Sequence, residues 1–300
     1  MTAEALIGKT PNLQSPSPAV VRLLNLLDNP NADYDEVITT ISSDVVLSAK
    51  LHALCNSTTY GLAQQVASLE HGVLYLGLGE IHRLVMALSF GGQIGTELPG
   101  YDMEAGTLWR HCLVAALLTP RVLGLSQNLG LDTSIAYTAG LLHDIGKLVI
   151  GQTLDAAMRE KIHQLVLTER CSLLQAETSV IGCDHAEIGA CLLRRWRIPE
   201  IIVEAVANHH NPPLEEGPSL SAVVHVADAT AHQIGSSPGW ESFAVVVHEA
   251  AMTALNLSAS DIDALTFAAL DCQHKVEQQA EIPGIKTPEP RMSRAARRSF

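Results

Sequence analysis

Aromatic residues are scarce in this chain, at 4% of its 300 residues, although hydrophobic residues as a whole make up 47%. A core with so few rings has to be filled by Leu, Ala, Val and Ile, which is typical of helices that pack through aliphatic side chains. The hydrophobic fraction also argues against long disordered stretches. A chain of this length can form one large domain or two modest ones, with an ample core.

Paired cysteines of the CxxC kind are absent, because the six cysteines are scattered at positions 55, 112, 171, 183, 191 and 272. Such scattered cysteines predict free thiols in a reducing compartment and no disulfide framework. The N-terminus has no basic start followed by an apolar stretch, as a secretory signal would have. No run of about 18 apolar residues is available to span a bilayer. We therefore expect a cytoplasmic protein, of bacterial type.

Positive charge is also in short supply, with 19 Lys and Arg against 32 Asp and Glu and a net charge of −13. A surplus of negative charge opposes nonspecific attraction to nucleic acid and to anionic membranes. We expect neither a nucleic acid nor a membrane as partner. The charge balance does not predict the oligomeric state.

Strand patterns are nearly absent, and the apolar residues recur instead with helical spacing, so the fold is predicted to be all-α. The first ordered segment is expected near Ser15, where apolar residues three and four positions apart begin. Asp44 and Asp184 each stand just before a helical stretch and are predicted to cap it. The Gly-rich stretch at 91–102, GGQIGTELPGYD, predicts a connector between two periodic apolar blocks.

These patterns predict a two-lobed helical bundle. Residues 1–99 form the N-terminal helical lobe, residues 100–280 form a larger helical domain, and residues 281–300 form a basic tail. From Lys286 onward the tail is polar, with five basic residues and one acidic residue. We predict that the tail is disordered and that its removal leaves the melting temperature nearly unchanged, since it offers little apolar area to offset the entropy of ordering.

The segment LLHDIGK, residues 141–147, places His143 and Asp144 directly after an apolar run. An unpaired charge is costly in such surroundings. Two explanations are open. The two residues are either partnered polar groups of the core or ligands of a cation.

Further residues of the kinds that bind metal ions lie within or beside apolar helices of the second half, namely His111, His185, His209, His210 and Asp228. Together with His143 and Asp144 they number seven, from five segments, which is more than core histidines alone would suggest. Imidazole suits transition metals, and a carboxylate can bridge two ions. Without a cation, several buried polar groups would be left unpaired. The pattern favours a site for Fe, Mn, Zn or Ni, with two ions and iron favoured.

The order of these residues resembles the HD phosphohydrolase superfamily, and most closely its HDOD (HD-related output domain) branch. The stretches ISSDVVLSAKLHALCNSTTYG, SLEHGVLYLGLGEIHRLV and GCDHAEIGACLLRRWRIPEIIVEAVANHHNP carry the resemblance together with LLHDIGK, over roughly residues 10–235. The resemblance implies a metal site in which Asp144 bridges two ions. One ion would be held by His111, His143, Asp144 and Asp228, and the other by Asp144, His185, His209 and His210.

The resemblance also implies two roles that differ. Many HDOD members are regarded as regulatory modules, whereas HD enzymes hydrolyse phosphoesters. After His209-His210 this chain continues NPPLEEGPSL and has no GYP triplet, which argues against hydrolysis of cyclic di-GMP. Lys147 has two interpretations: a contact to a substrate phosphate, as in HD enzymes, or a solvated lysine at a helix C-terminus. His225 is interpreted as a support for the site or a surface group, and His232, His248, His163 and His274 as structural.

Three functions follow from the ligand set. We expect a bacterial signal-transduction protein of the HDOD type whose partner is a signalling protein or a phosphorylated small molecule. The alternative is a metal-dependent phosphohydrolase acting on a nucleotide or phosphoester, with Asp144 and Lys147 as its catalytic residues. A rarer alternative is a di-iron oxygenase, which absorption spectra and oxygen consumption would reveal.

Overall fold

The computed structural model contains helices and no strands in the part of the chain that it describes, which confirms the all-α prediction. Its only β-type pairing there is an isolated bridge between Leu98 and Met103. The described residues are 1–10, 12–27, 34–56, 66, 68–126, 129–213, 217–236, 239–241 and 245–278. The predicted tail, 281–300, lies outside these residues.

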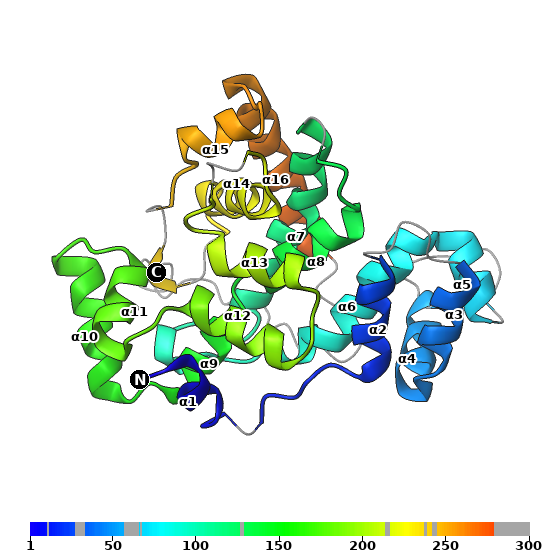
Figure 1. The fold of residues 1–300 in the computed structure, drawn as a ribbon, viewed down its shortest axis with the longest axis horizontal. Coiled ribbons are helices and arrows are strands. Elements are labelled where there is room, and N and C mark those ends of the chain that lie inside the picture. The colour runs from blue at the N-terminus through cyan, green and yellow to red at the C-terminus, as the bar shows by residue number, and fades with distance from the viewer. Residues whose placement is uncertain are drawn as a thin grey trace, which may run out of the picture.

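The helices of the first block lie together on the right of Figure 1. They are α2 (Pro18–Leu27), α3 (Tyr34–Ser42), α4 (Val45–Cys55), α5 (Leu69–Leu76) and α6 (Leu78–Ile94). Asp44 caps α4 as predicted, because its side chain accepts a hydrogen bond from the backbone N–H of Leu47 at 3.0 Å. The predicted connector begins later than expected, since α6 continues through Gly91 to Ile94.

A short helix, α1 (Ala3–Ile7), precedes the point at which order was expected to begin. Thr2 caps it, and Leu6 is buried at 1% exposure. The helix packs on α9 (Gly146–Thr153) and α12 (His185–Arg195), away from α2 to α6, as Figure 1 shows. The expectation that order begins near Ser15 was therefore wrong. Five residues are too few to display a helical period, so the sequence pattern carries no signal for α1.

The second block follows the connector, which contains the 3₁₀ turn η1 (Pro99–Tyr101). Besides α9 and α12, this block comprises α7 (Thr107–Leu125), α8 (Thr133–Leu142), α10 (Ala156–Thr168), α11 (Leu173–Ile181), α13 (Glu200–Asn208), α14 (Leu220–Gln233), η2 (Gly239–Glu241), α15 (Glu249–Ala254) and α16 (Ala259–Gln278). Asp184 caps α12 as predicted, with its side chain accepting from the backbone N–H of Glu187 at 2.9 Å.

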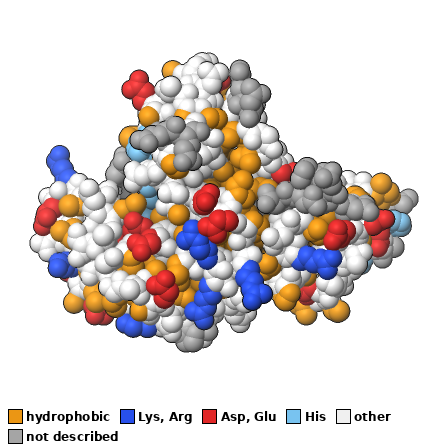
Figure 2. Space-filling model, in the orientation of Figure 1, with side chains coloured by type: hydrophobic (Ala, Val, Ile, Leu, Met, Phe, Trp, Pro, Cys, Tyr) orange, Lys and Arg blue, Asp and Glu red, His pale blue; other side chains and the backbone are white. Residues whose placement is uncertain are grey.

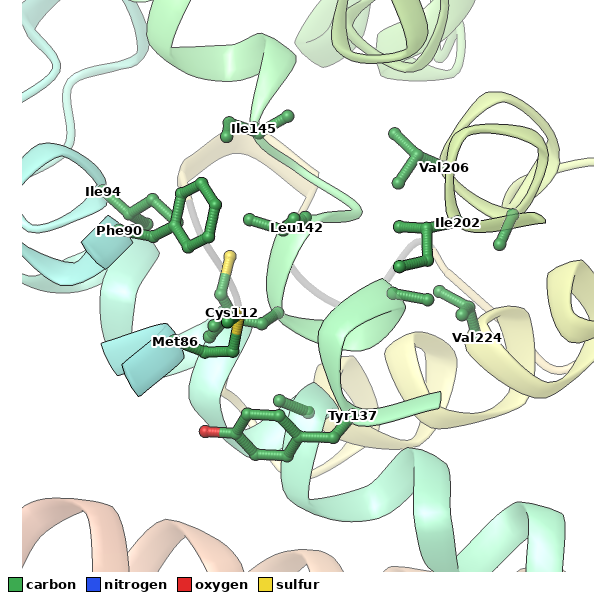
Figure 3. Close-up of a cluster of buried hydrophobic side chains, with 14 of the residues drawn as sticks. Met86, Phe90, Ile94, Cys112, Tyr137, Leu142, Ile145, Ile202, Val206 and Val224 are labelled. Carbon is green, nitrogen blue, oxygen red and sulfur yellow. The ribbon is translucent and has the colours of Figure 1, made fainter. Parts of the chain in front are cut away.

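The two blocks share one apolar core. Figure 3 shows Phe90 and Ile94 of α6 beside Cys112 of α7 and Leu142 of α8, and all four side chains are at most 1% exposed. The connector also lies tightly on the second block: a Cβ atom at Gly100 would stand 2.7 Å from Cα of Gly151 in α9. The division into domains at residues 99 and 100 stays a prediction.

Charged side chains of both signs are interspersed over the face shown in Figure 2, without a continuous basic surface. Among the described helices none is by itself long and apolar enough to cross a membrane. Two bent pairs, α3 with α4 and α5 with α6, pass that criterion only when their lengths are combined.

His82 of α6 contacts the second block and is expected to make the fold sensitive to acid. It is 3% exposed, and its Nε2 lies 3.3 Å from the hydroxyl of Thr138 in α8. Burial, with a smaller contribution from Arg83, lowers the pKa of His82 from 6.5 to about 3. Because the folded pKa lies below the unfolded one, stability is fully present above pH 6.5 and is lost as the pH falls from 6.5 towards 3.

His82→Leu should therefore weaken the dependence of the unfolding free energy on pH between 6 and 4. The change per titrating group is at most about 1.4 kcal/mol per pH unit. Urea denaturation at several pH values measures this slope. The matched variant His71→Leu, at an exposed position of α5, should leave the slope as in the unmodified chain. Equal slopes for the His82 variant and the unmodified chain would contradict the assignment.

Candidate metal centre

The seven side chains predicted as ligands converge on one buried region between the helices of the second block. They come from α7, from the turn between α8 and α9, from the start of α12, from the turn after α13 and from α14. Six of them are at most 1% exposed, and His210 alone is half-buried. The convergence agrees with the sequence analysis, whereas their role as ligands stays a prediction.

One half of the centre is formed by His111, His143 and Asp228. Asp228 Oδ1 lies 3.0 Å from His111 Nε2 and 3.4 Å from His143 Nε2. The two Nε2 atoms are 3.2 Å apart. Asp144 Oδ2 approaches the same nitrogen atoms at 3.7 and 3.5 Å. Four side chains thus surround one point.

The other half is formed by His185, His209 and His210 around the second oxygen of Asp144. Asp144 Oδ1 lies 3.4 Å from His185 Nε2 and 3.9 Å from His209 Nε2. The Nε2 atoms of His185 and His210 are 2.9 Å apart. Asp144 therefore directs one oxygen to each half, as a bridging carboxylate would.

These separations suit ligands of a common ion. Atoms about 2.1 Å from one ion are about 3.0 Å apart when the bonds meet at right angles, and about 3.4 Å apart at the tetrahedral angle. The distances among His111, His143 and Asp228, 3.0 to 3.4 Å, and those from His185 to its neighbours, 2.9 and 3.4 Å, fall in or close to this range. The distances from Asp144 to His143, His111 and His209 are longer, at 3.5, 3.7 and 3.9 Å. The donor set, imidazole with carboxylate and no thiolate, is one that transition metals accept.

The tautomers of four histidines follow from the groups behind them. Nδ1 of His143 lies 2.8 Å from the carbonyl oxygen of Gly140, and Nδ1 of His209 lies 2.7 Å from that of Val206. Nδ1 of His111 lies 2.5 Å from the carbonyl oxygen of Ser236, and Nδ1 of His185 lies 2.8 Å from a carboxylate oxygen of Glu177. Because these oxygens can only accept, each Nδ1 carries the proton. In the neutral rings, each Nε2 therefore presents a lone pair to the centre.

Several of these atoms lack a conventional partner. Asp144 Oδ1, Asp228 Oδ1 and His209 Nε2 are buried and have no hydrogen-bond partner among the described residues. Leaving such atoms unsatisfied is costly, so a cation at the centre fits them better than a polar core pair does. The core-pair explanation predicted that Asp144 bonds to backbone N–H groups or to a neighbouring histidine. Among the described residues Asp144 Oδ2 accepts from Lys147 and lies 3.5 Å from His143 Nε2, so the choice between the two explanations depends on metal analysis.

Protonation equilibria indicate what occupies the centre when no metal is bound. Burial lowers the pKa of His143, but Asp144 and Asp228 outweigh it and raise this pKa to about 10. Burial lowers the pKa of His209 to about 3. For Asp144, burial raises the pKa, but Lys147 and His143 bring it well below its usual value. A proton on His143 therefore offsets part of the carboxylate charge, and an ion held by His143 would take the place of that proton.

Lys147 is completely buried, so the interpretation as a solvated lysine at a helix C-terminus was wrong. It lies in the first turn of α9, and its Nζ atom donates to Asp144 Oδ2 at 2.8 Å. The three-residue spacing places both side chains on one side of the helix start, as expected. Lys147 therefore stabilises the ionised form of Asp144. A contact to a substrate phosphate stays a prediction.

His232 was wrongly interpreted as a histidine outside the cluster. Its Nε2 lies 3.3 Å from Asp228 Oδ1, and its ring centroid is 4.8 Å from that of His111. The signal was present in the sequence, because His232 follows Asp228 by four residues and so lies on the same face of α14. His225 supports the site: its Nδ1 donates to the carbonyl of His209 at 2.8 Å, and its Nε2 accepts from the backbone N–H of His248 at 3.1 Å.

Glu177 of α11 is a second residue that sequence reasoning missed. It is completely buried, and its Oε2 accepts from both the backbone N–H and the Nδ1–H of His185, at 2.9 and 2.8 Å. Its other oxygen accepts from the hydroxyl of Tyr101 at 2.6 Å. A carboxylate behind a histidine fixes the ring and makes its other nitrogen a better ligand. An acidic residue inside an amphipathic helix gives no sequence signal that separates it from a surface residue.

Glu177→Gln should weaken metal binding about ten- to hundredfold, because the neutral amide no longer increases the basicity of His185. Competition against a chelator of known affinity measures the change. Glu160→Gln, at an exposed position of α10, serves as the matched control and should bind metal like the unmodified chain. Equal affinities for both variants would show that Glu177 does not act on the centre.

Comparison with known families and structures identifies proteins of similar sequence and fold. The sequence profile of the HDOD domain matches residues 13–212. The crystal structure of an HDOD domain protein of unknown function from Geobacter sulfurreducens has a TM-score of 0.69 and 24% identity, covering 93% of this chain and 96% of that chain. A candidate signal-transduction protein from Marinobacter aquaeolei VT8 has a TM-score of 0.74 and 20% identity, covering 92% of this chain and 61% of that chain. At these identities the two structures show a shared fold.

Among curated proteins, ribonuclease Y of Thermus thermophilus is 29% identical over 224 residues, which are 74% of this chain and 30% of that protein. The chain spans less than half the length of the first curated relatives it matches, at 40% and 30%.

Proposed function

This chain belongs to the HDOD family, and from that premise we propose that it is a signal-transduction protein holding two divalent transition-metal ions in the buried centre. Four lone pairs and two carboxylates directed at one region carry the metal part of the proposal. Asp144 shares its two oxygens between the halves, which supports two ions. Fe, Mn, Zn and Ni all accept imidazole and carboxylate ligands, and iron is the ion that we favour among them.

The signalling role is supported by the HDOD match and by the absence of a GYP triplet after His210. In this proposal the helical blocks contact a partner protein, or the centre receives a phosphorylated small molecule, in the bacterial cytoplasm. The net charge of −13 argues against nucleic acid or an anionic membrane as the partner.

A metal-dependent phosphohydrolase is the second candidate. When bound, two ions lower the pKa of a water molecule and stabilise the charge that develops on a phosphoryl group. The residues of this chain would hold that site: Lys147 keeps Asp144 ionised, and Glu177 orients His185. The observation in its favour is that the whole HD ligand set is retained, together with the similarity to a ribonuclease.

Phosphoester turnover separates the two candidates. Protein of measured metal content is assayed with an aryl phosphate, an aryl phosphodiester, a cyclic dinucleotide and a short RNA, with manganese or iron added. The signalling proposal expects two ions per chain and no turnover above that of the Asp144→Asn variant. Turnover that requires Asp144 would contradict the signalling proposal and favour the phosphohydrolase. Cleavage of RNA would also contradict the proposal that nucleic acid is not a partner.

A further inference from the structure

A cleft of about 630 Å³ adjoins the proposed metal centre at His210. Its volume lies within the range of about 300 to 1,000 Å³ that is usual for small-molecule sites. His210 lines the cleft, while its Nε2 faces His185 in the second half of the centre at 2.9 Å. A ligand in the cleft can therefore place one group beside that half.

The walls of the cleft carry almost no charge. Apolar walls come from Leu173 and Val246 and from the ring of Trp240, which packs against Tyr101 and His163 at centroid distances of 5.9 and 4.9 Å. Asp184 is the one acidic residue among the described residues that line the cleft, and none of them is Lys or Arg. The sequence has no Lys or Arg between Arg197 and Lys275, a segment that supplies several of the lining residues, from His210 to His248.

The charge at the end of the cleft follows from the groups that surround the centre. Two divalent ions would bring four positive charges. Asp144, Asp228 and Glu177 would offset three of them, so the end of the cleft beside His210 would remain positive. A phosphomonoester carries about −1.5 to −2 at neutral pH, on one group that can lie at this positive end. A diphosphate or triphosphate would bring further negative charges against walls that have no cation to neutralise them.

On the basis of the proposed metal centre, we propose that the cleft is a binding site for an organic phosphomonoester. Its single phosphate lies at the His210 end, and its uncharged, flat or apolar body lies against Trp240. A nucleoside monophosphate satisfies both conditions, whereas nucleoside polyphosphates and cyclic dinucleotides do not. The cleft thus favours a ligand with a single phosphate, because the described residues of its walls include no Lys or Arg that could neutralise a second one.

Isothermal titration of the metal-loaded full chain with adenosine monophosphate, adenosine diphosphate and inorganic phosphate tests this selection. Metal content and nucleotide integrity are measured on the same samples. The monophosphate should bind about tenfold more tightly than the diphosphate. Trp240→Phe should weaken monophosphate binding severalfold, because a smaller ring stacks less well, and should leave inorganic phosphate unaffected.

A matched pair at one exposed position of α11, Ser179→Lys and Ser179→Glu, tests the role of wall charge. The Lys variant should remove most of the tenfold difference in affinity between the monophosphate and the diphosphate. The Glu variant should bind both nucleotides more weakly. Tighter binding of the diphosphate to the unmodified chain would overturn the inference. If the protein carries two ions per chain but does not bind the monophosphate, the inference is also overturned, whereas the proposed metal centre is not. A chain that takes up no metal would overturn the centre and this site together.

Discussion

Asp144→Asn should reduce the metal content of the purified protein from about two ions per chain to well below one, because an amide is a much weaker bridge than a carboxylate. The oxygens of Asp144 face both halves of the centre, at 3.4 Å from His185 Nε2 and 3.5 Å from His143 Nε2. Loss of this one carboxylate should therefore weaken the binding of both ions. Elemental analysis of protein prepared without chelators measures the effect.

Asp228→Asn provides a graded comparison, since Asp228 Oδ1 lies 3.0 and 3.4 Å from His111 and His143, whereas the carboxylate approaches His209 of the other half only to within 4.8 Å. It should leave about one ion per chain, held around His185, His209 and His210. Asp132→Asn is the control for the chemical change itself. Asp132 is an exposed cap of α8, where Asn caps as well as Asp, and its variant should retain both ions.

Asp144→Asn also removes the carboxylate to which the buried Lys147 donates, and breaking such a buried pair costs about 3 to 5 kcal/mol when no metal is present. Circular dichroism therefore accompanies each metal measurement. A folded Asp144→Asn protein that still carries two ions would show that the carboxylate is not a bridge.

Gly146→Ala should prevent the second half of the centre from forming and should destabilise the fold. A Cβ atom at Gly146 would lie 1.9 Å from the carbonyl oxygen of His185 and 2.7 Å from the backbone N of Gly189. Both obstacles are backbone atoms of α12, so no side chain can rotate away, and α9 has to separate from α12. Overpacking costs about 1 to 3 kcal/mol where side chains can adjust, and we expect this backbone clash to exceed that range.

Urea denaturation and metal analysis measure the two consequences of Gly146→Ala. The matched control is Gly92→Ala in α6, where an added Cβ meets nothing within 4 Å. Alanine is the better helix former by about 0.5 to 1 kcal/mol, so the control should be slightly more stable than the unmodified chain. A Gly146→Ala protein of unchanged stability and metal content would contradict the close approach of α9 and α12.

The segment LLHDIGK shows how much of the centre was open to prediction. The pairing of His143 with Asp144 after an apolar run pointed to either a cation site or a partnered core pair, because residue type and an apolar setting are properties of the sequence itself. The turn that directs both side chains into one region depends on Gly146, whose necessity appears only when α12 is packed against it. Lys147 illustrates the same limit, since the sequence left a phosphate contact and a solvated position both open, and only the packing shows that Lys147 is buried against Asp144.

His232 and Glu177 mark the difference between patterns within one helix and contacts between helices. His232 could have been found, because its spacing from Asp228 is a local property of α14. Glu177 could not, because it reaches His185 from α11, and Tyr101 reaches Glu177 from the connector 76 residues earlier. No periodicity links such positions.

The sequence by itself determined the all-α class, the HDOD membership and the kinds of side chain available for a metal centre, since helical periodicity and residue order are encoded locally. Only the tertiary structure decided which carboxylate supports which histidine, which ring nitrogen carries its proton, and that α1 joins the second block. Those outcomes depend on distances between segments far apart in the chain, and the packing of whole helices sets these distances. The kinds of ligand atom at the centre therefore depend on residue type, and the distances between them depend on how the helices pack.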